Sequence, residues 1–259
     1  RRFGVDGIPL AWFQSYLSNR MQTYTVDLTQ SEIIRVGCSV PQGSVLGPLE
    51  FIAYTEDVVE IFRSNAIHHH LFADDKQAYA LAKIADVDII RQRLAQCVND
   101  VRAWCGSRRL QLNPSKTELV WFGSRSNLRK LSTTNLTLSV DGGIIEPVSV
   151  VRDLGVYLDG ELTMKQHVSR TTSSCLFHLR RLRQIRRFVG QDATKRLVSA
   201  FVFSRLDYCN AVLAGLPMET IRPLQRVQNA AARLISGVPQ RQHITPILQH
   251  LHWLPVKSR

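Results

Sequence analysis

The amino-acid sequence predicts an α+β fold, with antiparallel strands and packed helices in residues 1–159 and helices alone in residues 160–259. Strand and hairpin signals, such as Asp141-Gly142-Gly143 between two apolar runs, end before residue 160. Helical periodicity continues from there. The charge also changes: residues 1–159 hold 17 Lys/Arg and 17 Asp/Glu, whereas residues 160–259 hold 16 and 4. Strands followed by helices are typical of the α+β class.

The composition limits the class of protein. The 259 residues are 44% hydrophobic and 21% charged, which is enough for a packed core. No apolar run has membrane-spanning length and no signal-peptide pattern is present, so we expect no membrane partner. The five cysteines are scattered and never form C-x-x-C, which indicates an intracellular, reducing compartment, the cytoplasm or the nucleus. The start at Arg1-Arg2-Phe3-Gly4 predicts an N-terminally truncated fragment.

The first elements of the chain are predicted by local spacing. Apolar and aromatic residues follow Pro9 at helical intervals, and proline favours the start of a helix. Rough alternation then predicts a two-stranded hairpin, and the turn at Gly43-Ser44 leads into a second helix. The expected ranges are a helix at 8–20, strands at 21–28 and 31–36, and a helix that ends near residue 62.

The clearest helix spans residues 86–105. Val87, Ile90, Leu94, Val101 and Trp104 follow the i, i+3, i+4 rule, so this stripe predicts core packing. The other elements expected before residue 160 are two strands flanking Asp74-Asp75, strands at 118–122, 136–140, 144–148 and 150–158, and an exposed loop at 124–133.

Three helices are expected in the basic second part, at about 162–189, 192–205 and 219–235. In the first of them, Arg180, Arg183 and Arg187 share one face, opposite an apolar stripe. A row of this kind is usually a solvated face. The ratio of 16 basic to 4 acidic residues instead favours contact with a nucleic-acid backbone.

Asp74 and Asp75 are the candidate metal ligands. They follow the apolar run Leu71-Phe72-Ala73 and fall in a tight turn between two strands. Adjacent carboxylates repel each other unless water or a cation screens them, and Mg²⁺ prefers carboxylate oxygens. A solvated turn is the alternative explanation of this pair. The run His68-His69-His70 is a weaker candidate, because neighbouring side chains of a strand point to opposite faces.

The motifs together resemble the reverse transcriptase of non-LTR retrotransposons, LINE-type elements of the jockey and chicken-repeat-1 groups. Residues 40–49 (VPQGSVLGPL) match motif B, and Phe72-Ala73-Asp74-Asp75 matches the catalytic motif C. Leu112-Asn113 with Lys116-Thr117 resembles motif D, and residues 154–159 (LGVYLD) resemble motif E, the primer grip. The run Leu251-His252-Trp253-Leu254-Pro255 resembles the segment that follows the polymerase core in LINE elements, and so favours them over group II intron or telomerase enzymes.

The resemblance implies a right-hand polymerase, with the palm and part of the fingers in residues 1–159 and a helical, basic thumb in residues 160–259. It implies an RNA template, a DNA primer or target, deoxynucleoside triphosphates and two Mg²⁺ ions. The implied roles are metal ligation for Asp74 and Asp75, general acid catalysis for Lys116, nucleotide and template binding for Pro41, Gln42 and Gly43, primer grip for Leu154, Gly155 and Val156, and backbone contact for Arg180, Arg183 and Arg187.

The sequence also departs from the family pattern. Motif A, which carries the first catalytic aspartate upstream of motif B, is absent, and Asp6 is in the wrong place to replace it. Glu50 and Glu56 stand where the family has apolar and amide residues. We therefore expect an RNA-directed DNA polymerase by descent whose fragment is inactive alone. The alternative is a non-catalytic RNA- or DNA-binding relic of a mobile element.

Overall fold

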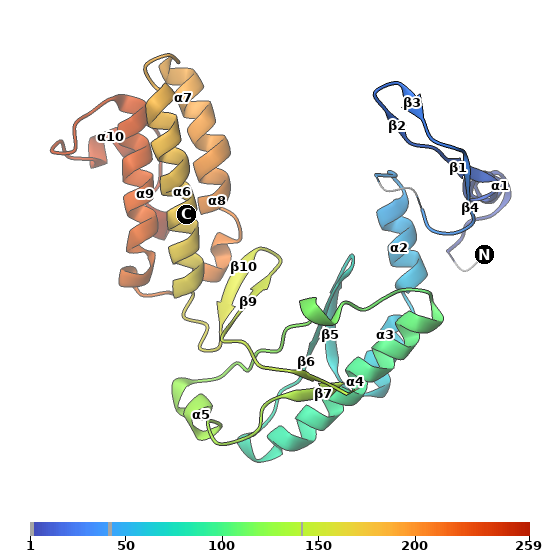
Figure 1. The fold of residues 1–259 in the computed structure, drawn as a ribbon. Helices are drawn as coiled ribbons and strands as arrows, with labels where there is room; N and C mark the ends of the chain where they lie inside the picture. Colours follow the sequence, from blue (N-terminus) through green and yellow to red (C-terminus); the bar gives the residue numbers. More distant parts are fainter. Residues whose placement is uncertain (1–2, 41–42, 141) are drawn as a thin grey trace. The chain divides into compact units, whose positions relative to one another are not determined.

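The computed structural model describes residues 3–40, 43–140 and 142–259 (Figure 1). Its contacts divide the chain into two compact units, Arg1–Leu81 and Ala82–Arg259. This structural boundary differs from the functional division expected after residue 159, because helix α6 (Lys165–Ile185) packs against strand β10 (Val156–Asp159) within the second unit. The division into palm and thumb stays a prediction about function.

The first unit combines short helices with hairpins. Its elements are α1 (Gly7–Leu17), β1 (Arg20–Gln22), β2 (Thr25–Val26), β3 (Thr29–Gln30), β4 (Ile34–Val36), α2 (Gly47–Thr55), α3 (Val58–Ser64), β5 (His68–Phe72) and β6 (Asp75–Tyr79). The hairpin predicted for residues 21–36 is confirmed in part: β1 pairs with β4, and β2 with β3.

The helix expected to end near residue 62 is broken into α2 and α3. The buried Thr55 donates its hydroxyl to the carbonyl oxygen of Phe51 at 2.8 Å. A threonine that bonds back to the carbonyl four residues earlier bends or weakens a helix. A turn at Glu56-Asp57 therefore separates the two helices.

The first unit has a small core. Its described residues bury only Thr55, Val58, Phe62 and Ile67. Large apolar side chains remain exposed elsewhere in the unit, with Leu28 99% exposed. Its hairpins and helices are thus held mainly by local hydrogen bonds and a few apolar contacts.

The second unit begins with α4 (Val87–Ser107), which confirms the helix expected at 86–105. The elements that follow before the helical part are α5 (Arg125–Lys130), β7 (Leu138–Val140), β8 (Gly143–Ile145), β9 (Val150–Asp153) and β10. The strand expected at 118–122 is wrong: the described chain forms only a bridge between Leu119 and Pro147 there.

A helix stands where an exposed loop was expected at 124–133. The side-chain oxygen of Ser124 accepts a hydrogen bond from the backbone N–H of Asn127 at 3.3 Å, which caps the N-terminus of α5. Nearby, the indole N–H of Trp121 donates to the carbonyl oxygen of Leu136 at 3.1 Å. The prediction failed because a helix of six residues is too short for a periodic signal.

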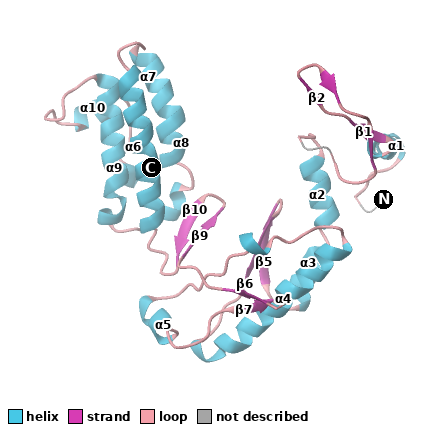
Figure 2. Ribbon diagram, viewed as in Figure 1, coloured by secondary structure: helices cyan, strands magenta, loops and turns pink. Residues whose placement is uncertain are grey.

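The helical part of the second unit is a bundle (Figure 2). Its elements are α6, α7 (Gln191–Val198), a π-helical turn (Ser199–Phe203), α8 (Ser204–Leu206), α9 (Met218–Ser236) and α10 (Thr245–His250). The three expected helices are confirmed, although the second contains the π turn. The core joins buried residues of α6 (Val168, Cys175, Leu179, Leu182) to the buried face of α9.

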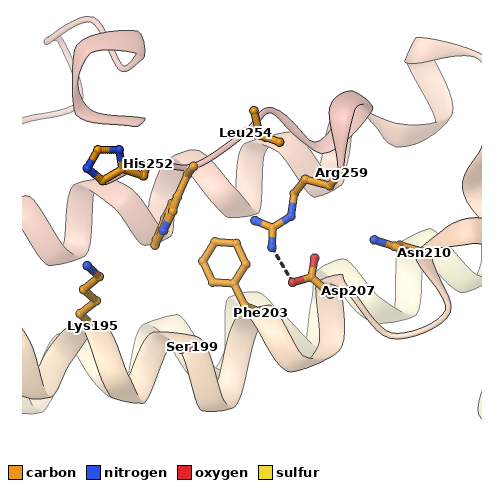
Figure 3. Close-up of a pocket in the computed structure, with 9 residues that line it drawn as sticks. Lys195, Ser199, Phe203, Asp207, Asn210, His252, Leu254 and Arg259 are labelled. Atoms are coloured by element: carbon orange, nitrogen blue, oxygen red, sulfur yellow. Dashed lines mark hydrogen bonds and ion pairs between the residues drawn. The ribbon is translucent and has the colours of Figure 1, made fainter. Parts of the chain in front are cut away.

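The C-terminal segment docks on this bundle. Gln228 of α9 is fully buried and donates its amide N–H to the carbonyl oxygen of Leu254 at 2.7 Å. The side-chain oxygen of Gln225 accepts the N–H of Val256 at 2.8 Å. The segment also lines a pocket of about 550 Å³, where Arg259 forms an ion pair with Asp207 (Figure 3).

The strands of the described residues form five separate two-stranded antiparallel sheets. The α+β class is confirmed, but the single palm sheet that was expected is not formed by these residues. Most strands have two to four residues, so each ladder ends at its own hairpin turn. Among the described helices, none is long and apolar enough to cross a bilayer.

The five cysteines are free thiols. Cys38 and Cys209 are exposed, and Cys97, Cys105 and Cys175 are buried. Burial raises the pKa of Cys97 and that of Cys175 to about 11, so both thiols stay protonated at neutral pH. These two residues act as small apolar core side chains.

Candidate functional site

The β5–β6 hairpin carries the aspartate pair at its tip. Phe72 pairs with Asp75, so Ala73 and Asp74 form a two-residue turn. Ala73 has a φ of 53°, a value that a tight hairpin turn can require at its first central position. Both aspartates are exposed. The predicted strand–turn–strand is confirmed and presents the two carboxylates to solvent.

Lys76 anchors this tip to helix α2. Its Nζ lies 3.4 Å from the carbonyl oxygen of Asp74 and 5.5 Å from the ring centroid of Phe51. The first distance places the ammonium group next to the aspartate turn. The second distance, to Phe51 of α2, is within cation–π range. The motif C turn is therefore held against the helix that follows motif B.

The aspartate pair has the ligand chemistry of a magnesium site. Mg²⁺ is commonly held by one or two carboxylates together with waters and substrate phosphates. Asp74 and Asp75 fit that requirement for one ion. Within the described ranges, no group of three or more His, Cys, Asp or Glu residues is placed to hold a metal.

The histidine run shows the alternation that was predicted. His69 stacks on Phe62 with ring centroids 5.0 Å apart, whereas His68 stacks on Tyr79 at 5.3 Å. His68 and His70 are exposed, and His69 is half-buried. The three imidazoles therefore serve different neighbours.

The motif B loop precedes α2. Pro41 and Gln42, two of its three predicted binding residues, lie outside the described residues. Gly43 has a φ of 84°, and a Cβ added there would meet nothing within 4 Å. The glycine thus allows a left-handed backbone next to open space. The hydroxyls of Ser44 and Tyr16 form a hydrogen bond that ties the loop to α1.

Glu50 is an acid whose carboxylate oxygens are buried. It lies in the first turn of α2, and both its carboxylate oxygens are buried without a hydrogen-bond partner among the described residues. Burying an unpaired carboxylate is costly. We therefore expect this acid to weaken α2, and the departure from the family pattern at Glu50 stays a prediction.

Lys116 lies in the second unit, on a 3₁₀ turn (Pro114–Lys116). Asn113 shapes this turn, since its side-chain oxygen accepts from the backbone N–H of Ser115 at 3.1 Å and from its hydroxyl at 2.6 Å. The side chain of Lys116 is exposed. The turn that was expected is confirmed, whereas the general-acid role stays a prediction.

The predicted primer grip is a hairpin turn. Leu154 and Gly155 connect β9 to β10 with φ values of 42° and 89°, so the single strand expected at 150–158 is wrong. Positive φ at both central positions is typical of a type I′ turn, which matches the twist of the two strands. Val156, the third predicted residue, is buried at the start of β10.

Tyr208 holds this turn against the bundle. Its hydroxyl donates to the carbonyl oxygen of Leu154 at 2.6 Å. A Cβ added at Gly155 would lie 3.1 Å from a ring carbon of Tyr208, so only glycine fits this contact without displacement. No sequence signal predicts this contact, because the two residues are 54 positions apart.

Asp159 shapes the connection from β10 to α6. Its carboxylate accepts from the backbone N–H of Thr163 at 2.9 Å, from the Thr163 hydroxyl at 2.9 Å, and from the backbone N–H of Met164 at 3.0 Å. These bonds fix the loop before α6, whose N-cap residue Met164 makes no side-chain cap hydrogen bond. The hairpin and the first bundle helix are thus positioned together.

Arg180 and Arg183 lie on α6, and Arg187 lies just after its end. All three are exposed, and they face away from Leu179 and Leu182 in the core. The predicted separation of a basic face from an apolar face is confirmed. Their contact with nucleic acid stays a prediction.

His167 makes the stability of the second unit sensitive to acid. It is 5% exposed, and its Nδ1 lies 3.5 Å from the backbone N–H of Tyr157, from which it accepts a hydrogen bond. Burial lowers the pKa of His167, and burial followed by the charges of Arg205 and Arg181 lowers that of His178. Both imidazoles are therefore neutral in the folded state at neutral pH.

The unfolded chain binds more protons than the folded chain once the pH falls below about 6.5, the ordinary histidine value. Acidification from about pH 7.5 to about pH 5.5 is thus expected to lower the free energy of unfolding, by at most about 1.4 kcal/mol per pH unit for each histidine. Urea unfolding, whose midpoint falls with this free energy, measures the effect. The replacement His167→Gln should make the drop smaller. An equal drop in the variant and the parent would contradict this assignment.

Comparison with known proteins identifies the family. The family model described as reverse transcriptase (RNA-dependent DNA polymerase) matches residues 1–158, more than half of the chain. The chain belongs to the reverse transcriptase family. The resemblance to the enzymes of non-LTR mobile elements, predicted from the motifs, is confirmed. The matched region contains residues 40–49 and the Asp74-Asp75 turn, and the family has a polymerase palm-type fold.

Three proteins similar to this chain come from fruit flies. The chain is 30% identical over 245 residues to the probable RNA-directed DNA polymerase from transposon BS of Drosophila melanogaster. This alignment covers 87% of the chain and 25% of the relative. The RNA-directed DNA polymerases from mobile element jockey share 25% over 162 residues in D. melanogaster and 22% over 234 residues in D. funebris. These alignments cover 60% and 87% of this chain, and 17% and 25% of the relatives. The chain thus spans a quarter or less of the relatives' length. No solved structure matches it.

Proposed function

We propose that this chain is part of an RNA-directed DNA polymerase of a non-LTR retrotransposon, which extends a DNA primer on an RNA template. The observation that carries the proposal is the exposed Asp74-Asp75 turn inside the region matched by the reverse transcriptase family. The five free thiols support action in the cytoplasm or the nucleus, where cysteines stay reduced.

Each set of residues has a distinct task in this proposal. Asp74 and Asp75 would hold Mg²⁺, whose charge would offset that of the triphosphate and would favour loss of the proton from the attacking 3′ hydroxyl. Gly43, with Pro41 and Gln42, lines the nucleotide and template site. Lys116 donates a proton to the leaving pyrophosphate. These residues act through their positions and charges, because positioning and charge stabilisation dominate phosphoryl transfer.

The remaining assignments concern the primer and the duplex. Leu154, Gly155 and Val156 hold the primer strand at the β9–β10 turn, and residues 160–259 form the thumb. The exposed arginines Arg180, Arg183 and Arg187 contact the phosphate backbone. The hydrogen bond between Tyr208 and the β9–β10 turn supports the primer-grip assignment. The excess of basic residues in residues 160–259 supports the thumb and the backbone contacts of its arginines.

A primer-extension assay tests the proposal on two proteins. The first is the 259-residue chain, and the second is a chimera in which this chain replaces the matched region of the transposon BS protein, called the BS chimera below. With an RNA template, a DNA primer and Mg²⁺, we expect product from the BS chimera and none from the chain alone, which has only two of the ligands that a two-metal site needs.

Two outcomes would contradict these expectations. Product from the chain alone would show that Asp74 and Asp75 suffice without a third carboxylate. An inactive but folded BS chimera, beside an active BS protein, would favour the second candidate function, a non-catalytic nucleic-acid-binding relic. The buried, unpaired Glu50 carboxylate is the observation that keeps this candidate open.

A further inference from the structure

Besides the exposed arginine row on α6, a basic pocket lies at the junction of the β9–β10 hairpin and the helical bundle. It is a pocket of about 480 Å³, called the arginine pocket below, whose lining includes Arg152 of β9, Arg170 of α6 and Arg205 of α8. Among the described residues that line it, none is an aspartate or a glutamate. A concave site with one sign of charge concentrates counter-ions of the opposite sign.

Two of the arginines share one aromatic ring. Arg152 pairs directly across the hairpin with Tyr157, and its guanidinium carbon lies 5.8 Å from the centroid of the tyrosine ring. The guanidinium of Arg170 lies 4.4 Å from the same centroid. Both guanidinium groups lie within cation–π range of this ring, so two like charges are held close together. Their mutual repulsion is a free-energy cost that a bound anion would offset.

Three acidic residues lie near the arginine pocket in sequence. Asp153 follows Arg152 in β9, and because neighbouring side chains of a strand point to opposite faces, it faces away from Arg152. Asp207 forms an ion pair with Arg259, and Asp159 accepts its hydrogen bonds from Thr163 and Met164. Arg205 donates one N–H to the carbonyl oxygen of Phe201 at 2.8 Å, so its guanidinium is held in place. Guanidinium groups fixed in this way suit phosphate better than ammonium groups do.

The other lining groups also suit a phosphodiester. Thr171, Ser174 and Ser204 contribute hydroxyls, which donate hydrogen bonds to phosphate or sugar oxygens. Tyr208 lines the pocket with its ring and ties the hairpin to the bundle through the carbonyl oxygen of Leu154. The walls of the pocket therefore come from segments that are joined by a direct hydrogen bond.

We propose that the arginine pocket binds the phosphate backbone of a nucleic-acid strand and is the main electrostatic anchor of the helical unit, ahead of the exposed row on α6. The proposal rests on the proposed function. It differs in its residues, because Arg152, Arg170 and Arg205 converge on one concave site, whereas Arg180, Arg183 and Arg187 follow an exposed, convex helix face.

Three triple variants of equal charge test the proposal in the 259-residue chain. The pocket variant is Arg152→Gln, Arg170→Gln and Arg205→Gln; the row variant changes Arg180, Arg183 and Arg187 to Gln; the control changes Arg125, Arg129 and Lys130 of α5 to Gln. Binding to a fluorescent RNA–DNA duplex is measured by anisotropy over a range of salt concentrations. Circular dichroism checks the fold of each variant.

The pocket variant is expected to lose at least about tenfold in affinity, and its salt slope should fall by about one for each arginine that contacts phosphate. The row variant should lose less, and the α5 control should match the parent. A pocket variant that binds as well as the α5 control, while the row variant loses binding, would overturn the inference and leave the proposed function standing. An unsubstituted chain that does not bind duplex at low salt, or that binds polyglutamate equally well, would instead count against nucleic-acid binding itself.

A second measurement avoids dependence on the folding of the variants. The unsubstituted chain is treated with phenylglyoxal, which modifies arginine, with and without the duplex, and the modified positions are mapped by mass spectrometry. Protection of Arg152, Arg170 and Arg205 by the duplex is the expected result. Equal modification of these arginines in both samples would overturn the proposal.

Discussion

Replacement of Asp74 or Asp75 by asparagine in the BS chimera is expected to abolish primer extension. Asparagine keeps the size of the side chain and its place in the β5–β6 turn but removes the charge that Mg²⁺ requires. A metal ion contributes several kcal/mol to stabilisation of the transition state, and about 1.4 kcal/mol corresponds to a tenfold change in rate. We expect a loss of about three orders of magnitude in the rate of nucleotide addition, measured with a radiolabelled primer.

The control for these variants is Asp86→Asn. Asp86 is exposed in the second unit, at the start of α4, and has no assigned role in the reaction. Its replacement should leave the extension rate within a factor of about two. If either motif C variant retained the parent rate while its duplex affinity stayed unchanged, the assignment of Asp74 and Asp75 as metal ligands would be wrong.

The replacement Gln228→Ala is expected to destabilise the helical unit by about 3 kcal/mol. The side chain is fully buried, so its loss leaves a cavity. It also removes the hydrogen bonds to the Leu254 carbonyl oxygen at 2.7 Å and from the Gln225 amide at 2.8 Å. A buried acceptor left without its donor costs about 1–3 kcal/mol by itself. The midpoint of guanidinium unfolding, followed by circular dichroism, measures the effect.

Gln184→Ala provides a matched comparison on α6. Gln184 is exposed, so the same chemical change should alter stability by less than about 0.5 kcal/mol. Similar midpoints for the two variants would show that Gln228 does not fasten the Leu251–Pro255 segment to the bundle. A lower midpoint in Gln228→Ala alone would explain why a polar residue occupies the apolar face of α9.

Long periodic elements were predictable from the sequence. The helix at 86–105 was confirmed as α4, and the helices expected at 162–189 and 219–235 were confirmed as α6 and α9. In each case the apolar stripe repeats over several turns, so the local pattern and the tertiary packing require the same structure. The Asp74-Asp75 turn was predictable for a similar reason, because an apolar run before two turn-favouring acids indicates a hairpin.

Short elements and breaks were not predictable. The hydroxyl of Thr55 helps to split one expected helix, Ser124 caps a helix of six residues, and the turn at Leu154-Gly155 divides one expected strand. Each depends on one or two hydrogen bonds, whose partners a periodicity argument does not contain. Leu154 also adopts a positive φ, which leucine sequences do not signal.

The sequence by itself determined the family, the motif order, the position of the aspartate pair and the separation of a neutral part from a basic part. These properties depend on residue identity, spacing and charge. Only the tertiary structure decided that Tyr208 holds the β9–β10 turn and that Arg152, Arg170 and Arg205 share one pocket. Residues 18 or more positions apart meet there because the hairpin folds back on itself and α6 packs beside α8, and such long-range contacts leave no periodic trace in the chain.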